Sequence, residues 1–254
     1  MFKNILQNLY TILVNINYIL SKKKYHKFIF IHPPQSGGNT IDYFFKINFG
    51  LRNFKINNYK EFDVFNFSSE NLKKYYLIYG HFPYEFTFRK NTENKFYYFT
   101  SIRNPKDRYL SNYYRNRRDV EKKGEKYMSL EEFLQLRLNQ GLDNFYVRFF
   151  SSKNIYADSS IEINENHFLD SIQNLKKLNF IFFLDNMRKD ILEFKKNFSL
   201  FFDMSLFFKL HKNKVSNSSY PKITSREKEL LEKLTFYDSK LYEDIKKYKL
   251  RQAI

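Results

Sequence analysis

The sequence predicts an α/β fold with a central, mostly parallel sheet flanked by helices. Four continuous apolar or aromatic runs lack the alternation of a half-exposed strand, which is typical of parallel strands buried on both faces. Stretches with helix caps lie between and after these runs, as in β-α-β units. A glycine pair follows the first run directly, where a strand would turn into a helix. The predicted strands are Lys27–Ile31, Tyr75–Tyr79, Phe96–Ile102 and Asn179–Leu184.

Composition limits the kind of protein that this can be. The chain has 254 residues, 43 % of them apolar, which is enough for one large domain with a substantial core. It has no Cys, which excludes disulfides and thiolate metal sites. A formal net charge of +17 favours anionic partners such as nucleotides or acidic glycans, although the abundance of Lys and Asn is also what an AT-rich genome produces. We expect a single domain over residues 25–254.

The first 24 residues are set apart from this domain. Residues 5–20 are apolar but are interrupted by Gln and Asn, and three lysines follow at positions 22–24. The run is shorter than the ~20 clean apolar residues of a membrane-spanning helix, and it lacks a signal-peptide cleavage site. We expect an amphipathic helix that packs on the domain or makes peripheral membrane contact through residues 5–24. The expected location is the cytoplasm, without a Golgi-type anchor.

Helix starts are marked by capping residues. Asn104 precedes a Pro at the first helical position, and Ser129 and Thr224 each begin a capping box with a Glu three residues on. Residues 52–60 and 209–219 are rich in Lys and Asn and predict surface loops. The predicted helices are Thr40–Asn48, Pro105–Arg118, Leu130–Gln140 and Ser225–Tyr248.

Residues 28–40 read FIFIHPPQSGGNT and predict an anion site. A buried strand that runs through a glycine pair into a helix places free amide N–H groups at the positive end of the helix dipole, where phosphate or sulfate binds. Glycine lets the backbone approach the anion without a Cβ in the way. The loop lacks the Gly-Lys-Ser/Thr ending of a nucleoside triphosphate–Mg²⁺ site. A tight strand–helix turn without a ligand is the alternative that this stretch alone leaves open.

Residues 96–118, FYYFTSIRNPKDRYLSNYYRNRR, predict a second anion contact. Arg103 follows the strand directly, at the carboxyl edge where open α/β sheets bind ligands, and a guanidinium grips phosphate with two hydrogen bonds. Ser111 lies two turns into the following helix. An Arg and a Ser at this spacing can hold a second phosphate at some distance from the first. Arg117 and Arg118 are interpreted as an ordinary solvated face.

The two motifs, in this order, resemble those of the Golgi-type carbohydrate sulfotransferases and their bacterial relatives, similar to the uronyl and heparan-sulfate sulfotransferases. That family has a strand ending in Pro-Lys-Thr-Gly-Gly-Thr-Ser and a later Arg-Asp-Pro-x-x-Arg-x-x-Ser-x-Tyr. Here the motifs read PQSGGNT (34–40) and RNPKDRYLSNY (103–113). The resemblance covers most of the chain, through the further segments YGHFPYEF (79–86), SLEEFL (129–134), DNFYVRFF (143–150) and FYDSKLYEDI (236–245).

The resemblance implies a P-loop-like three-layer sandwich that moves a sulfuryl group from 3′-phosphoadenosine 5′-phosphosulfate (PAPS) to a carbohydrate hydroxyl, without a metal. It implies that Arg103 and Ser111 hold the 3′-phosphate, which distinguishes PAPS from ATP. His81 lies where relatives carry a catalytic His, and an imidazole with an ordinary pKa of about 6.5 can accept the proton of the attacking hydroxyl. Glu85 is the alternative base, a strand-end histidine bonded to the backbone is the alternative interpretation of His81, and His32 is interpreted as a packing residue. The loop residues that would hold the 5′-phosphosulfate are Gln35, Ser36, Gly37, Gly38, Asn39 and Thr40.

One position departs from the family's pattern. The catalytic loop Lys, which neutralises charge on the bridging oxygen as the sulfuryl group leaves, is Gln35 here. Removing a preorganised hydrogen-bond donor that stabilises the charge developing in the transition state lowers the rate by roughly 10²–10³. The enzyme would then be slow, would use Lys106 or Arg108 instead, or would bind PAPS without turnover.

Other functions stay open beside sulfuryl transfer. One alternative is a non-catalytic relative that binds PAPS, its product 3′-phosphoadenosine 5′-phosphate (PAP) or a glycan, and another is a basic lipid-binding module on the same fold. A phosphotransferase would need Mg²⁺, for which the loop is poorly suited. Nucleic-acid binding has only the overall charge to support it, so that no nucleic-acid partner is expected.

Overall fold

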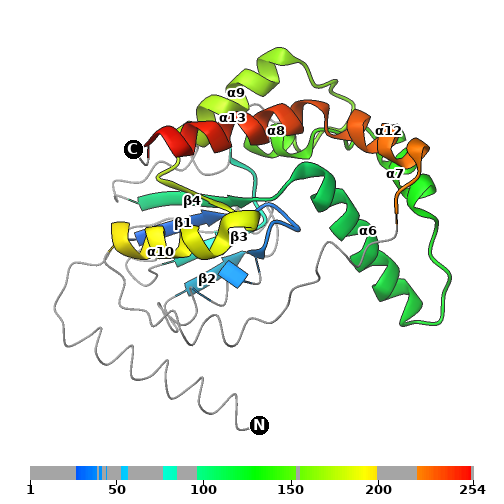
Figure 1. The fold of residues 1–254 in the computed structure, drawn as a ribbon, viewed down its shortest axis with the longest axis horizontal. Helices are drawn as coiled ribbons and strands as arrows, with labels where there is room; N and C mark the ends of the chain where they lie inside the picture. Colours follow the sequence, from blue (N-terminus) through cyan, green and yellow to red (C-terminus); the bar gives the residue numbers. More distant parts are fainter. Residues whose placement is uncertain are drawn as a thin grey trace, which may run out of the picture. The chain divides into compact units, whose positions relative to one another are not determined.

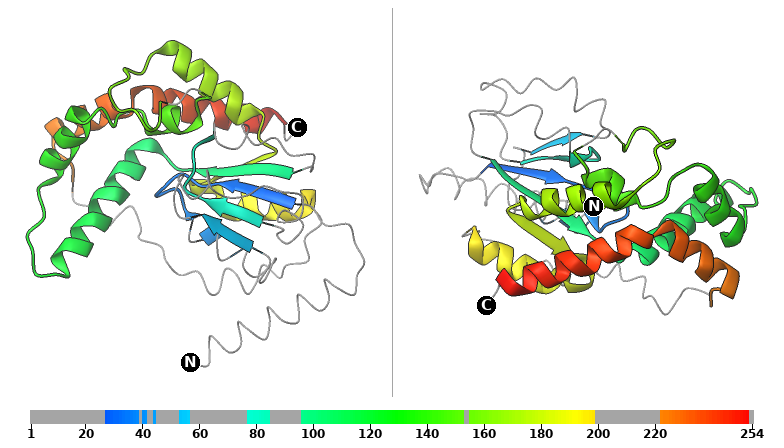
Figure 2. Two further views of the ribbon diagram at one scale, coloured as in Figure 1. Left: turned by 180° about the vertical axis from the view of Figure 1, so that it is seen from behind. Right: turned by 90° about the horizontal axis from the view of Figure 1, so that it is seen from above.

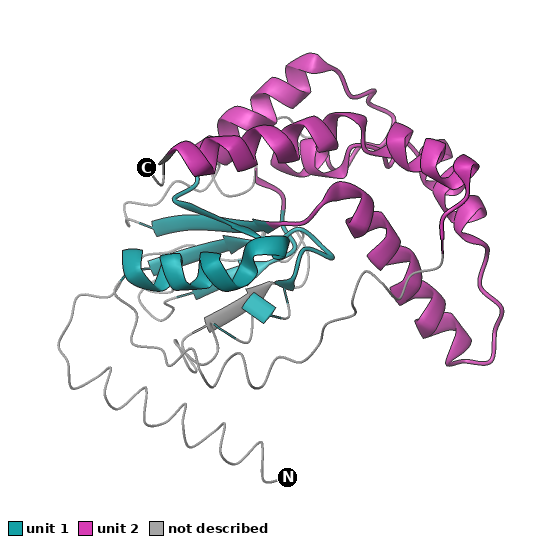
Figure 3. Cartoon of the chain, in the orientation of Figure 1, with its two compact units in different colours: residues 1–82, 88–101, 178–215 teal, residues 83–87, 102–177, 216–254 magenta. Residues whose placement is uncertain are grey.

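The computed structural model describes residues 27–38, 40–41, 44, 53–56, 77–84, 96–152, 155–198 and 222–252. They form two compact units, which Figure 3 shows in teal and magenta. Unit 1 contains the five strands, apart from the last residue of β4, and the helix that follows β5, and unit 2 contains the other labelled helices. The predicted helix within residues 1–24 lies outside the described residues, as does most of Thr40–Asn48. The single domain over residues 25–254 stays a prediction.

Unit 1 is built on a five-stranded sheet with the order β2-β3-β1-β4-β5 (Figure 1). The pairs β1–β3, β1–β4 and β2–β3 are parallel. Before β5, the amide of Asn179 donates to the carbonyl of Tyr98 at 2.8 Å, and the Asn179 side chain accepts from the Tyr98 amide at 2.8 Å. The strands are β1 Lys27–Ile31, β2 Asn53–Ile56, β3 Leu77–Gly80, β4 Phe96–Ile102 and β5 Phe180–Phe183.

The strand order reverses beside β1. The connection that leaves β1 leads to β2 on one side of it, whereas the connection that leaves β4 leads to β5 on the other side. Ile31 and Thr100 are register partners near the carboxyl ends of β1 and β4, and Thr100 Oγ1 donates to the Ile31 carbonyl at 2.6 Å. Open α/β sheets bind ligands at such a reversal. The loop that begins at His32 therefore starts at the edge of the sheet where a ligand is expected.

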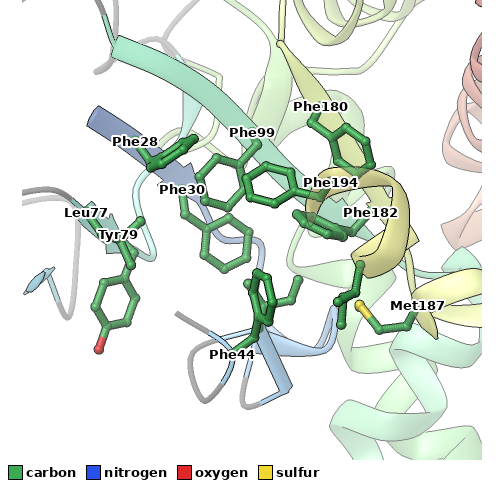
Figure 4. Packing of buried hydrophobic residues seen from close by; sticks show 12 residues of the cluster. Phe28, Phe30, Phe44, Leu77, Tyr79, Phe99, Phe180, Phe182, Met187 and Phe194 are labelled. Carbon is green, nitrogen blue, oxygen red and sulfur yellow. The ribbon is translucent and has the colours of Figure 1, made fainter. Parts of the chain in front are cut away.

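One face of the sheet is covered by α10 (Met187–Asn197). Alternate strand residues point to the same face, so Phe28 and Phe30 of β1 and Phe99 of β4 gather there against Phe194 of α10 (Figure 4). Phe30 and Phe99 stack with ring centroids 4.9 Å apart. Burying each such side chain contributes roughly 1.5–3 kcal/mol. Residues of the opposite parity are buried as well, which confirms strands buried on both faces: Ile29, Ile31, Ile78 and Ile181.

Unit 2 is helical. The Asn104 side chain caps α6 by accepting from the amides of Lys106 and Asp107, and both predicted capping boxes are present, at the starts of α7 and α12. α12 packs against α7, and α13 runs along α8 and α9 (Figures 1 and 2). Among the described helices, none combines the length and the apolar character needed to span a membrane. The helices are α6 Pro105–Glu121, α7 Leu130–Asn139, α8 Phe145–Phe150, α9 Glu165–Lys176, α12 Ser225–Leu234 and α13 Phe236–Gln252.

The predicted α/β, P-loop-like fold with a parallel sheet flanked by helices is confirmed, with two local corrections. The single helix predicted over Ser225–Tyr248 is wrong, because α12 ends at Leu234 and α13 begins at Phe236. Residues 52–60, predicted as a surface loop, contain β2. β2 is an edge strand of four residues, and edge strands carry the charged and polar residues that make a sequence look like a loop.

Candidate functional site

The loop after β1 turns sharply into a helix. Gln35, with φ 67°, and Gly37, with φ 85°, both have left-handed backbone, which a non-glycine residue adopts at a cost. The Gly37 carbonyl accepts from the amides of Thr40 and Ile41 at 3.0 and 3.3 Å, which closes the first helical turn. Within the described part of the chain, the amides of Gly37 and Gly38 have no acceptor. Two N–H groups at the start of a helix are therefore available to a bound anion.

Packing inside unit 1 explains why both loop positions are glycine. A Cβ on Gly38 would overlap the imidazole of His32, and a Cβ on Gly37 would lie 2.6 Å from Leu184 Cδ1. The sequence alone predicts that the glycine pair serves the approach of an anion. The structure adds a second cause, since both positions are closed to a side chain whether or not an anion binds.

His32 and His81 lie side by side at the ends of β1 and β3. Their ring centroids are 4.6 Å apart, and His32 also stacks on Phe30 with centroids 5.2 Å apart. His81 Nδ1 lies 3.0 Å from the carbonyl oxygen of His32. Because a carbonyl can only accept, Nδ1 carries the proton and Nε2 holds the lone pair of the neutral ring. His81 therefore has the tautomer that a base acting through Nε2 requires.

Arg103 is the first residue after β4. Its amide donates to the hydroxyl of Tyr146 at 2.9 Å, and the next residue is the cap of α6. Its side chain is half-buried, and within the described residues its guanidinium has no hydrogen bond, ion pair or ring contact. Ser111 lies half-buried on α6, two turns further on. A fixed backbone with an unengaged cation is what a phosphate-binding Arg requires.

The two cations considered as substitutes for the missing loop Lys both have partners inside unit 2. Arg108 is 5 % exposed, and its guanidinium carbon lies 3.3 Å from the centroid of the Phe145 ring. This is a buried cation–π contact. Lys106 Nζ lies 3.3 Å from Glu232 Oε1 on the surface. Each cation would have to leave its protein partner before it could stabilise a leaving group.

A buried carboxyl group lies at the start of α13. Asp238 is fully buried and accepts hydrogen bonds from the amides of Tyr146 and Val147, both at 3.0 Å. Burial raises the pKa of Asp238 to about 7, although the two amides and the nearby Arg108 act in the opposite direction. Burial likewise raises the pKa of Tyr109.

The structure places the predicted site residues in two groups. The loop and His81 meet in unit 1, where His32 contacts both Gly38 and His81, and Arg103 and Ser111 lie in unit 2. Asn39 and Glu85 lie outside the described residues. In the described ranges, no group of three or more His, Asp or Glu side chains is placed to hold a metal ion.

Tyr146 and Asp238 are two supporting residues that the sequence alone does not reveal. Residues 143–150 and 236–245 both match the family's pattern, but neither match predicts that the two segments contact each other. Their hydrogen bonds, over 92 positions of sequence for Tyr146 and Asp238, show the physical link.

Comparisons with known proteins bear on these observations. The model of the family described as "Sulfotransferase family" matches residues 18–249. Among solved structures, a match is the crystal structure of mouse sulfotransferase SULT7A1 complexed with PAP, with 17 % identity and a TM-score of 0.40, covering 81 % of this chain and 64 % of that one. This chain thus spans less than two thirds of the length of that protein. A search of curated proteins found no significant match. Because the family model covers most of the sequence, the chain belongs to the sulfotransferase family.

Proposed function

We propose that this chain transfers a sulfuryl group from PAPS to a hydroxyl of a carbohydrate, without a metal ion. The observation that carries the proposal is the pair of amides, on Gly37 and Gly38, that have no acceptor in the described chain and stand at the start of a helix after the central strand. Membership of the sulfotransferase family supports PAPS as the donor. The carbohydrate class of the acceptor is supported by the motif resemblance described above.

In this proposal the two phosphate groups of one nucleotide are held by different segments. The amides of Gly37 and Gly38 bind the 5′-phosphosulfate, since N–H groups at a helix start favour an anion. The Arg103 guanidinium and the Ser111 hydroxyl bind the 3′-phosphate. Arg103 is suited to this role because its backbone is anchored while its guanidinium has no partner among the described residues.

The chemical step is an in-line displacement at sulfur. The acceptor oxygen forms a bond to sulfur, the bond between sulfur and the bridging oxygen breaks, and PAP leaves with the bonding electrons. The proton of the acceptor hydroxyl passes to Nε2 of His81, whose Nδ1–H is held by the His32 carbonyl. The Gln35 carboxamide donates a hydrogen bond to the bridging oxygen in place of a Lys. Glu85 is the alternative proton acceptor.

A second candidate function is binding of PAPS, PAP or a glycan without turnover. Gln35 favours this candidate, because an uncharged amide stabilises a leaving phosphate less than an ammonium would. The protein partners of Lys106 and Arg108 point the same way, since each of these cations is already engaged.

Nucleotide binding tests the donor site directly. PAP and 5′-AMP differ only in the 3′-phosphate, so their affinities, measured by isothermal titration calorimetry, isolate the contribution of that group. We expect the native protein to prefer PAP and Arg103→Ala to lose most of that preference, because a charge-assisted contact in a pocket is worth on the order of 1.5–3 kcal/mol. Arg117→Ala is the control, since Arg117 pairs with Glu121 on the exposed face of α6. Equal affinity of the native protein for PAP and 5′-AMP would overturn the donor assignment.

Turnover separates the two candidate functions. Labelled sulfate from PAPS should appear on at least one member of a panel of glycans in the presence of EDTA. Binding of PAP without transfer to any glycan supports the non-catalytic candidate instead. A strict requirement for Mg²⁺ would indicate phosphoryl transfer and contradict the proposal.

A further inference from the structure

The backbone of Arg103 is held by a hydrogen bond that the proposed chemistry does not use. The Arg103 amide donates to the hydroxyl of Tyr146, 43 positions further along the chain, at 2.9 Å. Arg103 lies between β4 and α6, in neither a strand nor a helix, so its amide has no ladder or helical acceptor. Without the tyrosine oxygen, this amide would need another partner.

Tyr146 is itself held at both ends. Its side chain is fully buried, with the Phe150 ring centroid at 6.3 Å and the Arg108 guanidinium carbon at 5.8 Å from its ring. Its own amide donates to Asp238 at 3.0 Å. A hydroxyl on a ring packed in this way has little freedom to move. It therefore holds the Arg103 amide in one position.

The other end of the Arg103 segment is fixed by the start of α6. The Asn104 side chain accepts from the amides of Lys106 and Asp107 at 3.1 and 3.4 Å, and the Asn104 carbonyl accepts from the amide of Arg108 at 3.0 Å. The Arg103 backbone is thus fixed on both sides, by the Tyr146 hydroxyl at its amide and by the capped start of α6 after it.

We infer that Tyr146 is a positioning residue for nucleotide recognition, which fixes the Arg103 backbone so that the guanidinium presents its N–H groups to the 3′-phosphate. The inference rests on the proposed function for the role of Arg103. It adds a residue that never touches the nucleotide and that acts through one hydrogen bond to the backbone. A guanidinium that binds phosphate with two hydrogen bonds must be held closely in the productive geometry, which requires supporting residues.

Tyr146→Phe tests this role, because it removes one oxygen atom and leaves the ring. The affinities of the full chain for PAP and 5′-AMP are measured by calorimetry for the native protein and the variant. We expect PAP binding to weaken about tenfold while 5′-AMP binding stays within twofold of native, as the loss of a hydrogen bond next to a charged contact would give. A merely structural role would lower the melting temperature and the active fraction without changing the ratio of the two affinities.

Tyr109→Phe is the matched control. Tyr109 is also buried, and its hydroxyl donates to a backbone carbonyl, that of Leu142, at 2.6 Å. The control should leave the affinity ratio at the native value. If the native protein prefers PAP and Tyr146→Phe retains that preference in full, the positioning role is overturned and the proposed function stands. If the native protein binds PAP and 5′-AMP equally, the proposed function fails and the inference fails with it.

A measurement on the native chain keeps the inference testable should the variant not fold. The Arg103 amide should exchange its hydrogen slowly, although it lies outside strand and helix, because the Tyr146 hydroxyl protects it. Exchange at the rate of an exposed amide would show that the hydrogen bond does not persist, and would overturn the positioning role.

Discussion

Asn144 and Asp238 cap each other's helices: Asn144 caps the start of α13, and Asp238 caps the start of α8. The Asn144 side chain, at the start of α8, accepts from the amides of Tyr237 and Asp238 at 2.7 and 3.3 Å. Asp238, in the first turn of α13, accepts from the amides of Tyr146 and Val147. Each exchange satisfies amides that have no acceptor within their own helix. A cap is worth about 1 kcal/mol, so the two exchanges together stabilise the junction of α8 and α13.

We expect the stability of the chain to decrease as the pH rises from about 4 to about 8. Burial raises the pKa of Asp238 to about 7, whereas an Asp in an unfolded chain titrates at about 3.9. The folded state therefore keeps a proton that the unfolded state has already lost. The contribution of this proton to the free energy of unfolding is complete below about pH 4 and is lost as the pH rises through about 7. Its upper value is roughly 4 kcal/mol. Urea unfolding followed by circular dichroism across this range measures the slope.

Asp238→Asn is the control for this prediction. Asn keeps an oxygen acceptor for one of the two amides but does not titrate, so other groups alone set the remaining pH dependence. The variant should be less stable than the native chain at pH about 5 and should have the flatter profile. Parallel profiles for the two proteins would contradict the raised pKa.

The break between α12 and α13 is a feature that the local sequence does not predict. The spacing of apolar residues and the capping box at Thr224 correctly indicate a helix that begins at Ser225. The amides of the second helix are capped by Asn144, whose side chain lies 93 and 94 positions away from its partners. A cap from so distant a residue leaves no local signal, and the predicted helix therefore ran on through Thr235.

Local signals predicted the central strands well, and packing decided the rest. β1 and β4 have the predicted bounds because continuous apolar runs are a local property of a doubly buried strand. The glycine pair lies where the strand turns into a helix, as predicted, yet its contacts with His32 and Leu184 come from the turn and from the residue that follows β5. The tautomer of His81 depends on the His32 carbonyl, 49 positions earlier, which no spacing rule reveals.

Gly38→Ala should destabilise the chain by clashing with His32. The Cβ of the alanine would overlap the imidazole, which itself stacks on Phe30 and contacts the tilted ring of His81. Forcing an extra methyl group into a packed site costs about 1–3 kcal/mol. Thermal and urea unfolding of the variant measure this loss.

A double-mutant cycle with His32→Ala identifies the cause of that loss. If the imidazole is the obstacle, Gly38→Ala should cost much less in the His32→Ala background than in the native chain, which gives a clear coupling energy. An equal loss in both backgrounds would mean that the helix start, and not the ring, excludes the methyl group.

His81→Asn should lower kcat by about 10²–10⁴ if the imidazole removes the proton of the acceptor. The Asn amide N–H can still donate to the His32 carbonyl, as His81 Nδ1 does, but it has no basic nitrogen. His81→Ala removes both the hydrogen bond and the base. We expect the two variants to lose activity alike while their PAP affinity stays close to native, measured by sulfate transfer and calorimetry. If His81→Asn keeps its activity and only His81→Ala loses it, the role of His81 is to hold the loop and not to accept a proton.

Gln35→Lys should raise kcat, because it restores a cation where charge develops on the bridging oxygen. The gain could approach the roughly 10²–10³ that a preorganised donor supplies. Gln35 has left-handed backbone, with φ 67°, and Lys is no more restricted there than Gln, since neither is β-branched. PAP affinity should change much less than kcat, because in the proposed site the amides of Gly37 and Gly38 and the Arg103 guanidinium hold the product as well as the donor. Sulfate transfer under saturating PAPS measures the effect.

Gln140→Lys separates this local effect from the change in net charge. Gln140 is exposed at the carboxyl end of α7, so the variant has the same added charge away from the loop. It should leave kcat unchanged. A Gln35→Lys variant that binds PAP but transfers sulfate to no glycan would favour the non-catalytic candidate, because the missing cation would then not be what prevents turnover. A Gln35→Lys variant with less activity than the native chain would show that Gln35 already meets the charge of the leaving group better than a lysine can. The uncharged loop would then be a property of this enzyme and not a defect in it.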